Sequence, residues 1–267
     1  MSAVMQDRLY SASGFGQQVA KSFSAASQSY MQGARLQQQV ALDALAMLAK
    51  EPRGHLLDLG CGPGWLHPRL TDYCNTFTAV DLSAGMLAKA AQAALAKTYL
   101  QADAQQLPLA DNSVDTVFSS LMLQWCAKPA AVFAEVSRVL TPGGKVVITT
   151  LVEGTLAELA QAFAGLDSYP HVSRFLAVDS IKQAAFATAG VNWQFEQRRY
   201  PLYYPDVQTL ARELKLLGAN QVAGRRSGLT GKGYWQQLAR AYEIHRTMLG
   251  LPASYQALMI SGVKHGS

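Results

Sequence analysis

The sequence predicts an α/β protein built on a doubly wound, seven-stranded and mostly parallel sheet. Three observations carry this prediction. An apolar strand ends in a glycine-rich turn within residues 56–66, strands then alternate with amphipathic helices to about residue 150, and helices and loops follow before the last strand. This alternation is typical of parallel sheets, which bind ligands at the edge where the strands end.

The composition is that of a globular domain. The chain has 267 residues, of which 49% are hydrophobic and 15% charged, too apolar for a disordered chain. We expect a flexible tail at 1–16 and a single domain over 17–264. No apolar run reaches the roughly 18 residues of a membrane span, and the N-terminus lacks an apolar stretch of the signal-peptide type. We therefore expect a cytoplasmic protein without a membrane partner.

Charge and cysteine usage limit the possible partners. The net charge of +5 is compatible with ordinary solubility or with a preference for acidic partners, since a basic surface speeds encounters with anions. Nothing resembles a known DNA or RNA module, so we expect no nucleic acid. The three cysteines and five histidines show no ligand spacing, so we expect neither a disulfide framework nor a metal site.

The domain divides into three predicted parts. Residues 17–53 carry apolar stripes of one long helix or two joined helices, with a possible break at 27–29 that leaves Tyr30 near a bend. Residues 55–151 form the predicted ligand-binding core. Residues 152–264 supply the helices, loops and last strands on the substrate side.

The expected elements follow from apolar periodicity and turn residues. In the core we expect strands at 56–59, 76–80, 99–102, 114–119 and 146–148, and helices from about Pro63, after Ser83 and over 130–140. After it we expect helices at 155–166, 180–189, 205–217 and 234–249, loops at 169–178 and 218–233, a strand at 193–201, and a final antiparallel strand at 255–263 at the end of the sheet.

The glycine turn is the first candidate site. Gly60, Gly62 and Gly64 alternate at a strand end, where glycine permits positive φ and lets a ligand approach the backbone. The spacing differs from the G-x-G-x-x-G of nicotinamide enzymes. Asp58, within the strand, favours a ligand that carries a cation or an amine. S-adenosylmethionine (AdoMet) fits that description better than a pyrophosphate does.

Further acids follow the next strands. Asp81 ends the second strand, where a carboxylate can accept hydrogen bonds from both ribose hydroxyls, or serve only as an acid at a helix N-terminus. Asp103 follows the third strand, beside an expected adenine or as a plain turn residue. The remaining predicted cofactor-binding residues are Leu82, Met86, Ala104 and Ser119.

Taken together, these residues resemble the class I AdoMet-dependent methyltransferases, which have a Rossmann-like fold. The resemblance rests on Asp58-x-Gly60-x-Gly62-x-Gly64, Asp81, Asp103-Ala104 and Leu140-x-Pro142-Gly143-Gly144. Further motifs are similar to one branch, the malonyl-acyl-carrier-protein O-methyltransferases of biotin synthesis. These are Leu123-Gln124-Trp125-Cys126, the stretch 149–159, Pro170-His171-x-x-Arg174-Phe175-Leu176, Leu214-Lys215-x-x-Gly218-Ala219 and Leu251-Pro252-x-x-Tyr255.

The resemblance implies a carboxyl O-methyltransferase that uses AdoMet, releases S-adenosylhomocysteine and takes its malonyl group from acyl carrier protein. It implies substrate-side positions for Tyr30, Phe175 and Lys215, with Tyr30 and Lys215 as the catalytic pair. Arg174 is a rival cation for the carboxylate. Each also has a simpler reading: Tyr30 as a core aromatic, Lys215 as a solvated lysine and Phe175 as packing.

Two other functions remain open at this point. The chain could be another small-molecule methyltransferase, such as a quinone-ring C-methylase, or a module that binds AdoMet without chemistry. For the carrier protein, which is typically acidic, we expect docking on basic residues of the C-terminal third: Arg198, Arg199, Arg225 and Arg226. The choice between malonyl-carrier protein and malonyl-CoA is not encoded in these motifs.

Overall fold

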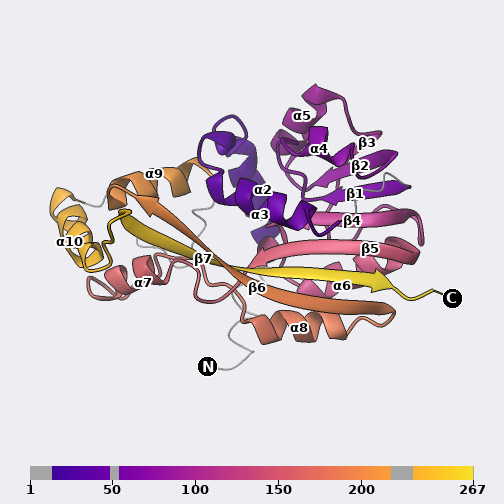
Figure 1. Cartoon of the computed structure of the whole chain (residues 1–267). Coiled ribbons are helices and arrows are strands. Elements are labelled where there is room, and N and C mark those ends of the chain that lie inside the picture. The colour runs from indigo at the N-terminus through magenta and orange to yellow at the C-terminus, as the bar shows by residue number, and fades with distance from the viewer. Residues whose placement is uncertain (1–13, 49–53, 218–230, 267) are drawn as a thin grey trace.

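The computed structural model describes residues 14–48, 54–217 and 231–266, and it is organised around one seven-stranded sheet (Figure 1). The strand order is β3-β2-β1-β4-β5-β7-β6. The strands are β1 (His55–Leu59), β2 (Thr76–Asp81), β3 (Thr98–Gln101), β4 (Val114–Ser120), β5 (Leu140–Leu151), β6 (Val191–Tyr204) and β7 (Leu251–Lys264). β1 to β5 pair in parallel and β7 runs antiparallel to both neighbours, so the predicted mostly parallel sheet is confirmed.

Helices cover both faces of this sheet (Figure 1). They are α2 (Phe15–Ala26), η1 (Tyr30–Gln32), α3 (Arg35–Leu45), α4 (His67–Leu70), α5 (Ala84–Ala90), η2 (Ala91–Ala93), η3 (Leu123–Trp125), α6 (Pro129–Val139), α7 (Ala157–Ala164), α8 (Val178–Phe186), α9 (Val207–Leu216) and α10 (Lys232–Glu243). The break between α2 and α3 falls where the sequence allows it, and Tyr30 begins the short turn between them.

Several element ends are shifted: α10 ends at Glu243 rather than at residue 249, and β5 is longer than the expected strand at 146–148. Three further differences affect the arrangement of the fold. β7 does not end the sheet but lies between β5 and β6, because it is buried on both faces while β6 alternates buried and exposed residues. The helix after the glycine turn begins at His67 rather than Pro63, since Gly64 at φ +74° keeps the chain in a turn. α2 begins at Phe15, inside the stretch expected as a tail, and residues 1–13 of that expectation lie outside the described residues.

β6 and β7 extend beyond the rest of the sheet. β5 pairs with β7 only as far as the Leu151–Ala257 pair, whereas β6 follows β7 on to the Tyr204–Leu251 pair. The extra length forms a two-stranded ribbon, residues 199–204 and 251–256. Figure 1 shows α7, α9 and α10 gathered around it. The ribbon therefore carries α7, α9 and α10 beyond the end of β5.

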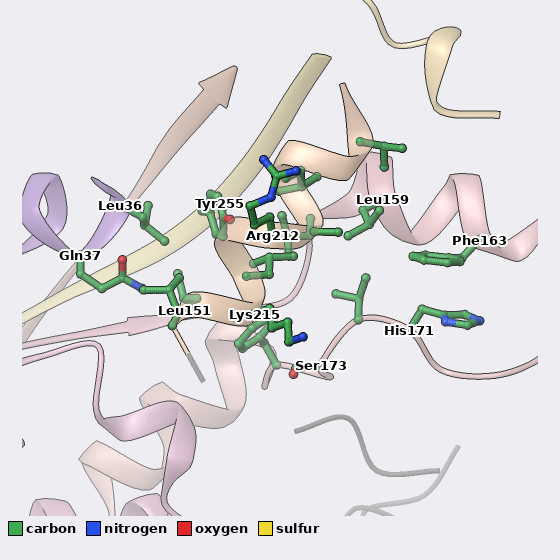
Figure 2. A pocket seen from close by; sticks show the side chains of 18 of the residues that line it. Leu36, Gln37, Leu151, Leu159, Phe163, His171, Ser173, Arg212, Lys215 and Tyr255 are labelled. Carbon is green, nitrogen blue, oxygen red and sulfur yellow. The ribbon is translucent and has the colours of Figure 1, made fainter. Parts of the chain in front are cut away.

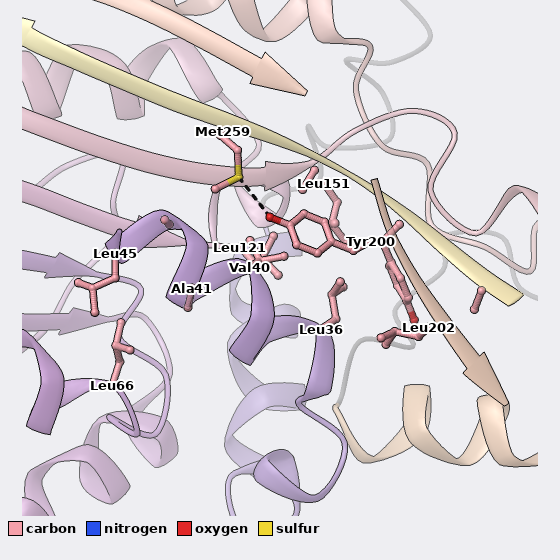
Figure 3. Packing of buried hydrophobic residues seen from close by; sticks show 14 of the residues in the cluster. Leu36, Val40, Ala41, Leu45, Leu66, Leu121, Leu151, Tyr200, Leu202 and Met259 are labelled. Atoms are coloured by element: carbon pink, nitrogen blue, oxygen red, sulfur yellow. Dashed lines mark hydrogen bonds between the residues drawn. The ribbon is translucent and has the colours of Figure 1, made fainter. Parts of the chain in front are cut away.

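Two apolar layers enclose the sheet because alternate strand residues point to opposite faces. Leu57 packs with α6 and α8, while its neighbour Leu56 packs on the face covered by α3. Figure 3 shows α3 side chains, among them Leu36 and Val40, facing Tyr200 of β6 and Leu151 of β5. No helix of the described ranges is long and apolar enough to cross a membrane.

The α6 layer gives a test of this core. Phe133 is fully buried and its ring lies 5.1 Å from that of Trp193, centroid to centroid. Phe133→Ala leaves a cavity between α6 and the sheet, so we expect the free energy of unfolding to fall by about 3–5 kcal/mol. Chemical denaturation measures this loss. Ala134→Gln, on the exposed side of the same helix, is the control and should change stability by no more than about 0.5 kcal/mol. Equal stability of the two variants would contradict the packing described.

Candidate active site

A first cavity, here called the donor cavity, lies at the edge of the sheet where β1, β2 and β4 end. Its volume is about 340 Å³. Seven of the predicted cofactor-binding residues line it: Gly60, Gly62, Asp81, Leu82, Met86, Asp103 and Ala104. They come from separate βα turns, which the parallel sheet brings to one edge.

The glycine turn shapes the floor of the donor cavity. Gly60, Gly62 and Gly64 all have positive φ, at +78°, +54° and +74°. A Cβ on Gly62 would have no atom within 4 Å, whereas one on Gly60 would meet the Met122 side chain at 2.5 Å. Gly62 thus leaves open space for a ligand, and Gly60 lets the chain after β4 pack against the turn.

Asp81 is held in the donor cavity by backbone groups. The Gly62 N–H donates to Oδ2 at 2.9 Å and the Ser83 N–H donates to Oδ1 at 2.8 Å. Burial raises the pKa of Asp81 to about 6, opposed by these two hydrogen bonds and aided by the charge of Asp58. Each oxygen keeps a lone pair for a ligand hydroxyl. Ser83 also caps α5, as the sequence predicts, by accepting from the Met86 N–H at 3.2 Å.

Three predicted cofactor residues do not line this cavity. Asp58 is buried beneath the turn, with Oδ2 3.2 Å from Nε2 of the fully buried His67. Gly64 faces that same ring, which a Cβ would approach to 2.8 Å. Ser119 is fully buried and donates to the Leu59 carbonyl at 2.6 Å. Ser120, one residue on, lines the cavity instead, because successive strand residues point to opposite faces.

α2 covers the donor cavity, which the sequence did not indicate. Ser24 Oγ lies 2.8 Å from Ser83 Oγ and accepts from the Gly85 N–H at 3.2 Å, so α2 is tied to the start of α5. The residues of α2 that line the donor cavity include Val19 and Phe23. Both belong to the predicted apolar stripe, which indicates a buried face without saying what that face covers.

A second cavity, here called the acceptor cavity, adjoins the first. Its volume is about 610 Å³, and it is enclosed by α3, α7, α9, α10, the ribbon and the loop 165–177. Figure 2 shows Leu36 and Gln37 at one end, Phe163 and His171 at the other, and Arg212 and Lys215 between them. Most of the side chains that line the acceptor cavity are aliphatic or aromatic.

The two cavities share one wall. Phe23, Tyr30, Leu121 and Trp125 line both. The Phe23 ring packs edge-on against Trp125 at 5.4 Å and against Tyr30 at 6.3 Å, between ring centroids. Burial, followed by the charge of Asp81, raises the pKa of Tyr30 well above its usual value. Its phenol therefore stays protonated and can donate a hydrogen bond where the cavities meet.

α9 brings two cations to the acceptor cavity. Arg212 and Lys215 are three residues apart on this helix and so share a face. Glu213, between them, points elsewhere: it accepts from the Tyr204 hydroxyl at 2.8 Å and pairs with Arg35 at 2.8 Å. The Ser29 hydroxyl donates to the Leu216 carbonyl at 3.2 Å. The end of α9 that carries Lys215 is thus fixed beside Tyr30.

Phe175 and Arg174, the remaining residues predicted to bind the substrate, lie in different places. Phe175 lines the acceptor cavity together with Tyr30 and Lys215. Arg174 lines a neighbouring hollow and is not among the residues of the acceptor cavity. Neighbouring loop residues point in different directions, which motif spacing does not encode. Sequence reasoning assigned no role to Arg212, Gln37 or Gln208 of this cavity. The stripe on α9 could have indicated Arg212, which lies one turn before Lys215.

Two of the four arginines that are expected to dock a carrier protein, Arg198 and Arg199, lie within the described residues. Arg198, on β6, hydrogen-bonds Glu196 through Nε at 2.6 Å, so its charge is largely neutralised. Arg199 donates to Ser254 Oγ at 2.8 Å and lies 3.8 Å from Glu158. Arg225 and Arg226 lie outside the described residues. Within the described ranges, no three His, Cys, Asp or Glu side chains are arranged to hold a metal ion.

Comparisons with known proteins agree with this geometry. A family model described as a methyltransferase domain matches residues 57–148. The chain is 39% identical to the malonyl-[acyl-carrier protein] O-methyltransferase of Alcanivorax borkumensis, over 92% of this chain and 86% of that protein. It is 40% identical to the biotin biosynthesis bifunctional protein BioHC of Cellvibrio japonicus over 89% of this chain, but spans only 48% of that longer protein.

Solved structures share the fold. The YcgJ protein of Bacillus subtilis superposes with a TM-score of 0.58 at 20% identity, over 86% of this chain and 99% of that one. A phosphoethanolamine N-methyltransferase of Haemonchus contortus in complex with AdoMet gives a TM-score of 0.57 at 20% identity, over 91% and 57% of the two chains. By its identity to full-length relatives, this chain is an AdoMet-dependent methyltransferase and belongs to the malonyl-[acyl-carrier protein] O-methyltransferase family.

Proposed function

We propose that this enzyme methylates the free carboxylate of a malonyl thioester on acyl carrier protein, giving the methyl ester that primes pimeloyl and biotin synthesis. One observation supports this most directly: the donor and acceptor cavities share the wall of Phe23, Tyr30, Leu121 and Trp125. A donor in one cavity can therefore meet an acceptor in the other at that wall. The relatives that match most of this chain carry the name of the same reaction.

The residues of the donor cavity fit AdoMet. The open space at Gly62 accommodates a ligand against the backbone, and the Asp81 oxygens, each bound to one N–H, can still accept from ribose hydroxyls. Asp103 Oδ1 accepts from the Gln105 N–H at 2.9 Å, and the Gln105 side-chain amide lies 3.1 Å from both Asp103 oxygens, which leaves a lone pair on Oδ2 for an amino group. The acids also favour a cationic donor. When bound, AdoMet supplies an electrophilic methyl group on a sulfonium.

The malonyl carboxylate has to be bound and oriented, but it does not have to be activated by a base. A carboxyl group with a pKa of about 4 is already ionised at neutral pH, so no general base is required. Tyr30 can donate its phenol proton to the carboxylate at the shared wall, and Lys215 can offset its charge. Lys215 and Arg212 are exposed to water before the substrate binds. An ion pair that is exposed to water contributes little binding free energy. We therefore expect either cation to stabilise the carboxylate only after the bound substrate has displaced water from the cavity.

The remaining rate enhancement comes from position. The Phe23, Leu121 and Trp125 side chains exclude water from the meeting point, and fixing the carboxylate oxygen in line with a methyl carbon can contribute up to about 7–11 kcal/mol. A cation that held the carboxylate too tightly would lower its nucleophilicity. The flexible ammonium of Lys215 suits this requirement better than a bidentate guanidinium does.

Carrier-protein docking on basic residues stays part of this proposal. Since Glu196 neutralises much of Arg198, Arg199, which keeps 61% of its side-chain surface exposed, is the better candidate on β6. The cytoplasmic location expected from the sequence also stays a prediction.

The direct test is mass spectrometry of malonyl-carrier protein after incubation with AdoMet and enzyme. We expect the carrier protein to gain the mass of one methylene, with release of S-adenosylhomocysteine. A malonyl-CoA reaction run in parallel compares the two thioesters. AdoMet binding without turnover of either thioester would contradict the proposal and favour a binding module or another acceptor, such as a quinone ring.

Lys215 gives a sharper prediction for the acceptor side. Lys215 lines the acceptor cavity but not the donor cavity. Lys215→Met should lower kcat/KM for the malonyl thioester at least about tenfold, since a hydrogen-bonded charge is lost. Calorimetry should give unchanged AdoMet affinity. Lys97→Met, at an exposed position before β3, is the matched control. Weakened AdoMet binding in Lys215→Met would remove this residue from the acceptor site.

Asp81 predicts a pH dependence of AdoMet binding. Its pKa of about 6 in the free enzyme means that the carboxylate gains a proton as the pH falls through 6. The acid form carries no charge and accepts fewer hydrogen bonds, so affinity should fall below pH 6, by up to about tenfold per pH unit. Calorimetry between about pH 7.5 and about pH 5 measures the slope. Asp81→Asn should bind weakly with no such slope, and a flat wild-type profile would contradict the assignment.

A further inference from the structure

A third concavity, here called the outer hollow, lies against the acceptor cavity. Its volume is about 610 Å³, and it is formed by the end of α7 and the loop 165–177. It shares Phe163, His171 and Val172 with the acceptor cavity, and these three residues are here called the neck. Figure 2 shows Phe163 and His171 at the end of the acceptor cavity opposite Leu36 and Gln37. None of the three neck residues lines the donor cavity, so the neck is separate from the wall that the two cavities share.

The neck is held in place by aromatic and polar contacts. His171 stacks on Phe163 with ring centroids 3.9 Å apart and planes 10° from parallel. Asp167 Oδ1 lies 2.7 Å from His171 Nε2, and the Tyr234 hydroxyl donates to Asp167 Oδ2 at 2.6 Å. These hydrogen bonds, that of Tyr234 first, lower the pKa of Asp167 to about 2. Both carboxylate oxygens are thus engaged, and the loop is tied to α10 at a defined position.

Arg174 carries the positive charge of the outer hollow. Among the described residues that line this hollow, it is the one arginine or lysine, and its side chain is exposed. It does not line the acceptor cavity. Its guanidinium therefore lies outside the cavity that the Tyr30 wall bounds. It can bind an anion that lies outside the neck, and phosphate is a group that arginine binds with two parallel hydrogen bonds.

We propose that the phosphopantetheine arm of the carrier protein enters through the outer hollow and the neck, and that Arg174 binds its phosphate. The inference rests on the proposed function, in which the malonyl carboxylate meets the Tyr30 wall. A thioester anchored there extends along the acceptor cavity toward the neck. The arm consists of methylene and amide groups, which suit a mostly apolar passage, and it ends in a phosphate, which Arg174 meets at the surface.

The test compares three malonyl thioesters. Malonyl-carrier protein and malonyl-CoA contain the phosphorylated arm, whereas malonyl-pantetheine lacks the phosphate. Arg174→Ala should raise KM at least about tenfold for the first two, the effect of losing one charged contact, with kcat nearly unchanged. KM for malonyl-pantetheine should stay within about twofold of wild type. Arg174→Glu should have a larger effect on the same two substrates. An effect on carrier protein alone would assign Arg174 to protein docking and overturn the phosphate site.

The control is Lys145→Ala, an exposed cation near the start of β5 and so at the opposite edge of the sheet, which should leave all three KM values unchanged. If wild-type enzyme methylates none of the thioesters, the proposed function itself fails. If it methylates all three and Arg174→Ala changes their KM values equally or not at all, the function stands and the phosphate site is wrong.

Discussion

Antiparallel pairing of β6 with β7 beyond the end of β5 is the constraint on which the substrate side depends. In the ribbon, Leu251–Gln256 pairs with Arg199–Tyr204 and loses the support of β5. The ladder pairs only the inward backbone groups of β7. Its outward groups bond to the segment around the start of α7: the Gln256 N–H donates to Thr155 Oγ1 at 3.0 Å and the Ser254 N–H to Glu158 Oε2 at 3.2 Å. Helices bury the apolar side chains of the ribbon. α7 is tied to the ribbon through the Leu156 N–H and the Ser254 carbonyl at 2.6 Å, and α9 through Glu213 and Tyr204. The acceptor cavity is the space between these helices.

Charge is divided between the two cavities in a way that suits the reaction. The donor cavity contains Asp81 and Asp103, which favour a cationic methyl donor. The acceptor cavity contains Arg212 and Lys215, which favour an anionic acceptor. Between them lies an aromatic and apolar wall with one phenol, that of Tyr30. A sulfonium and a carboxylate attract each other across such a wall more strongly than in water, because the local dielectric constant is lower.

Sequence reasoning grouped residues correctly in space where local backbone geometry places them. Gly62, Asp81 and Asp103 follow strand ends, and parallel strands bring such residues to one edge, where the structure places all three in the donor cavity. Sequence reasoning did not anticipate the direction in which individual side chains point. Asp58 lies in the same motif but is buried against His67, and Ser119 faces Leu59 while Ser120 faces the cavity. Arg174 and Phe175 are adjacent in the chain but line different spaces.

By itself the sequence determined the α/β class, the mostly parallel sheet, the AdoMet-type glycine turn and the family. These depend on apolar periodicity, glycine positions and short motifs, all of which are local in the chain. Only the tertiary structure decided that β7 lies inside the sheet, that α2 covers the donor cavity, and that Arg212 lines the same cavity as Lys215 while Arg174 lies outside it. These depend on which buried faces pack together, and apolar stripes show that a face is buried without showing its partner.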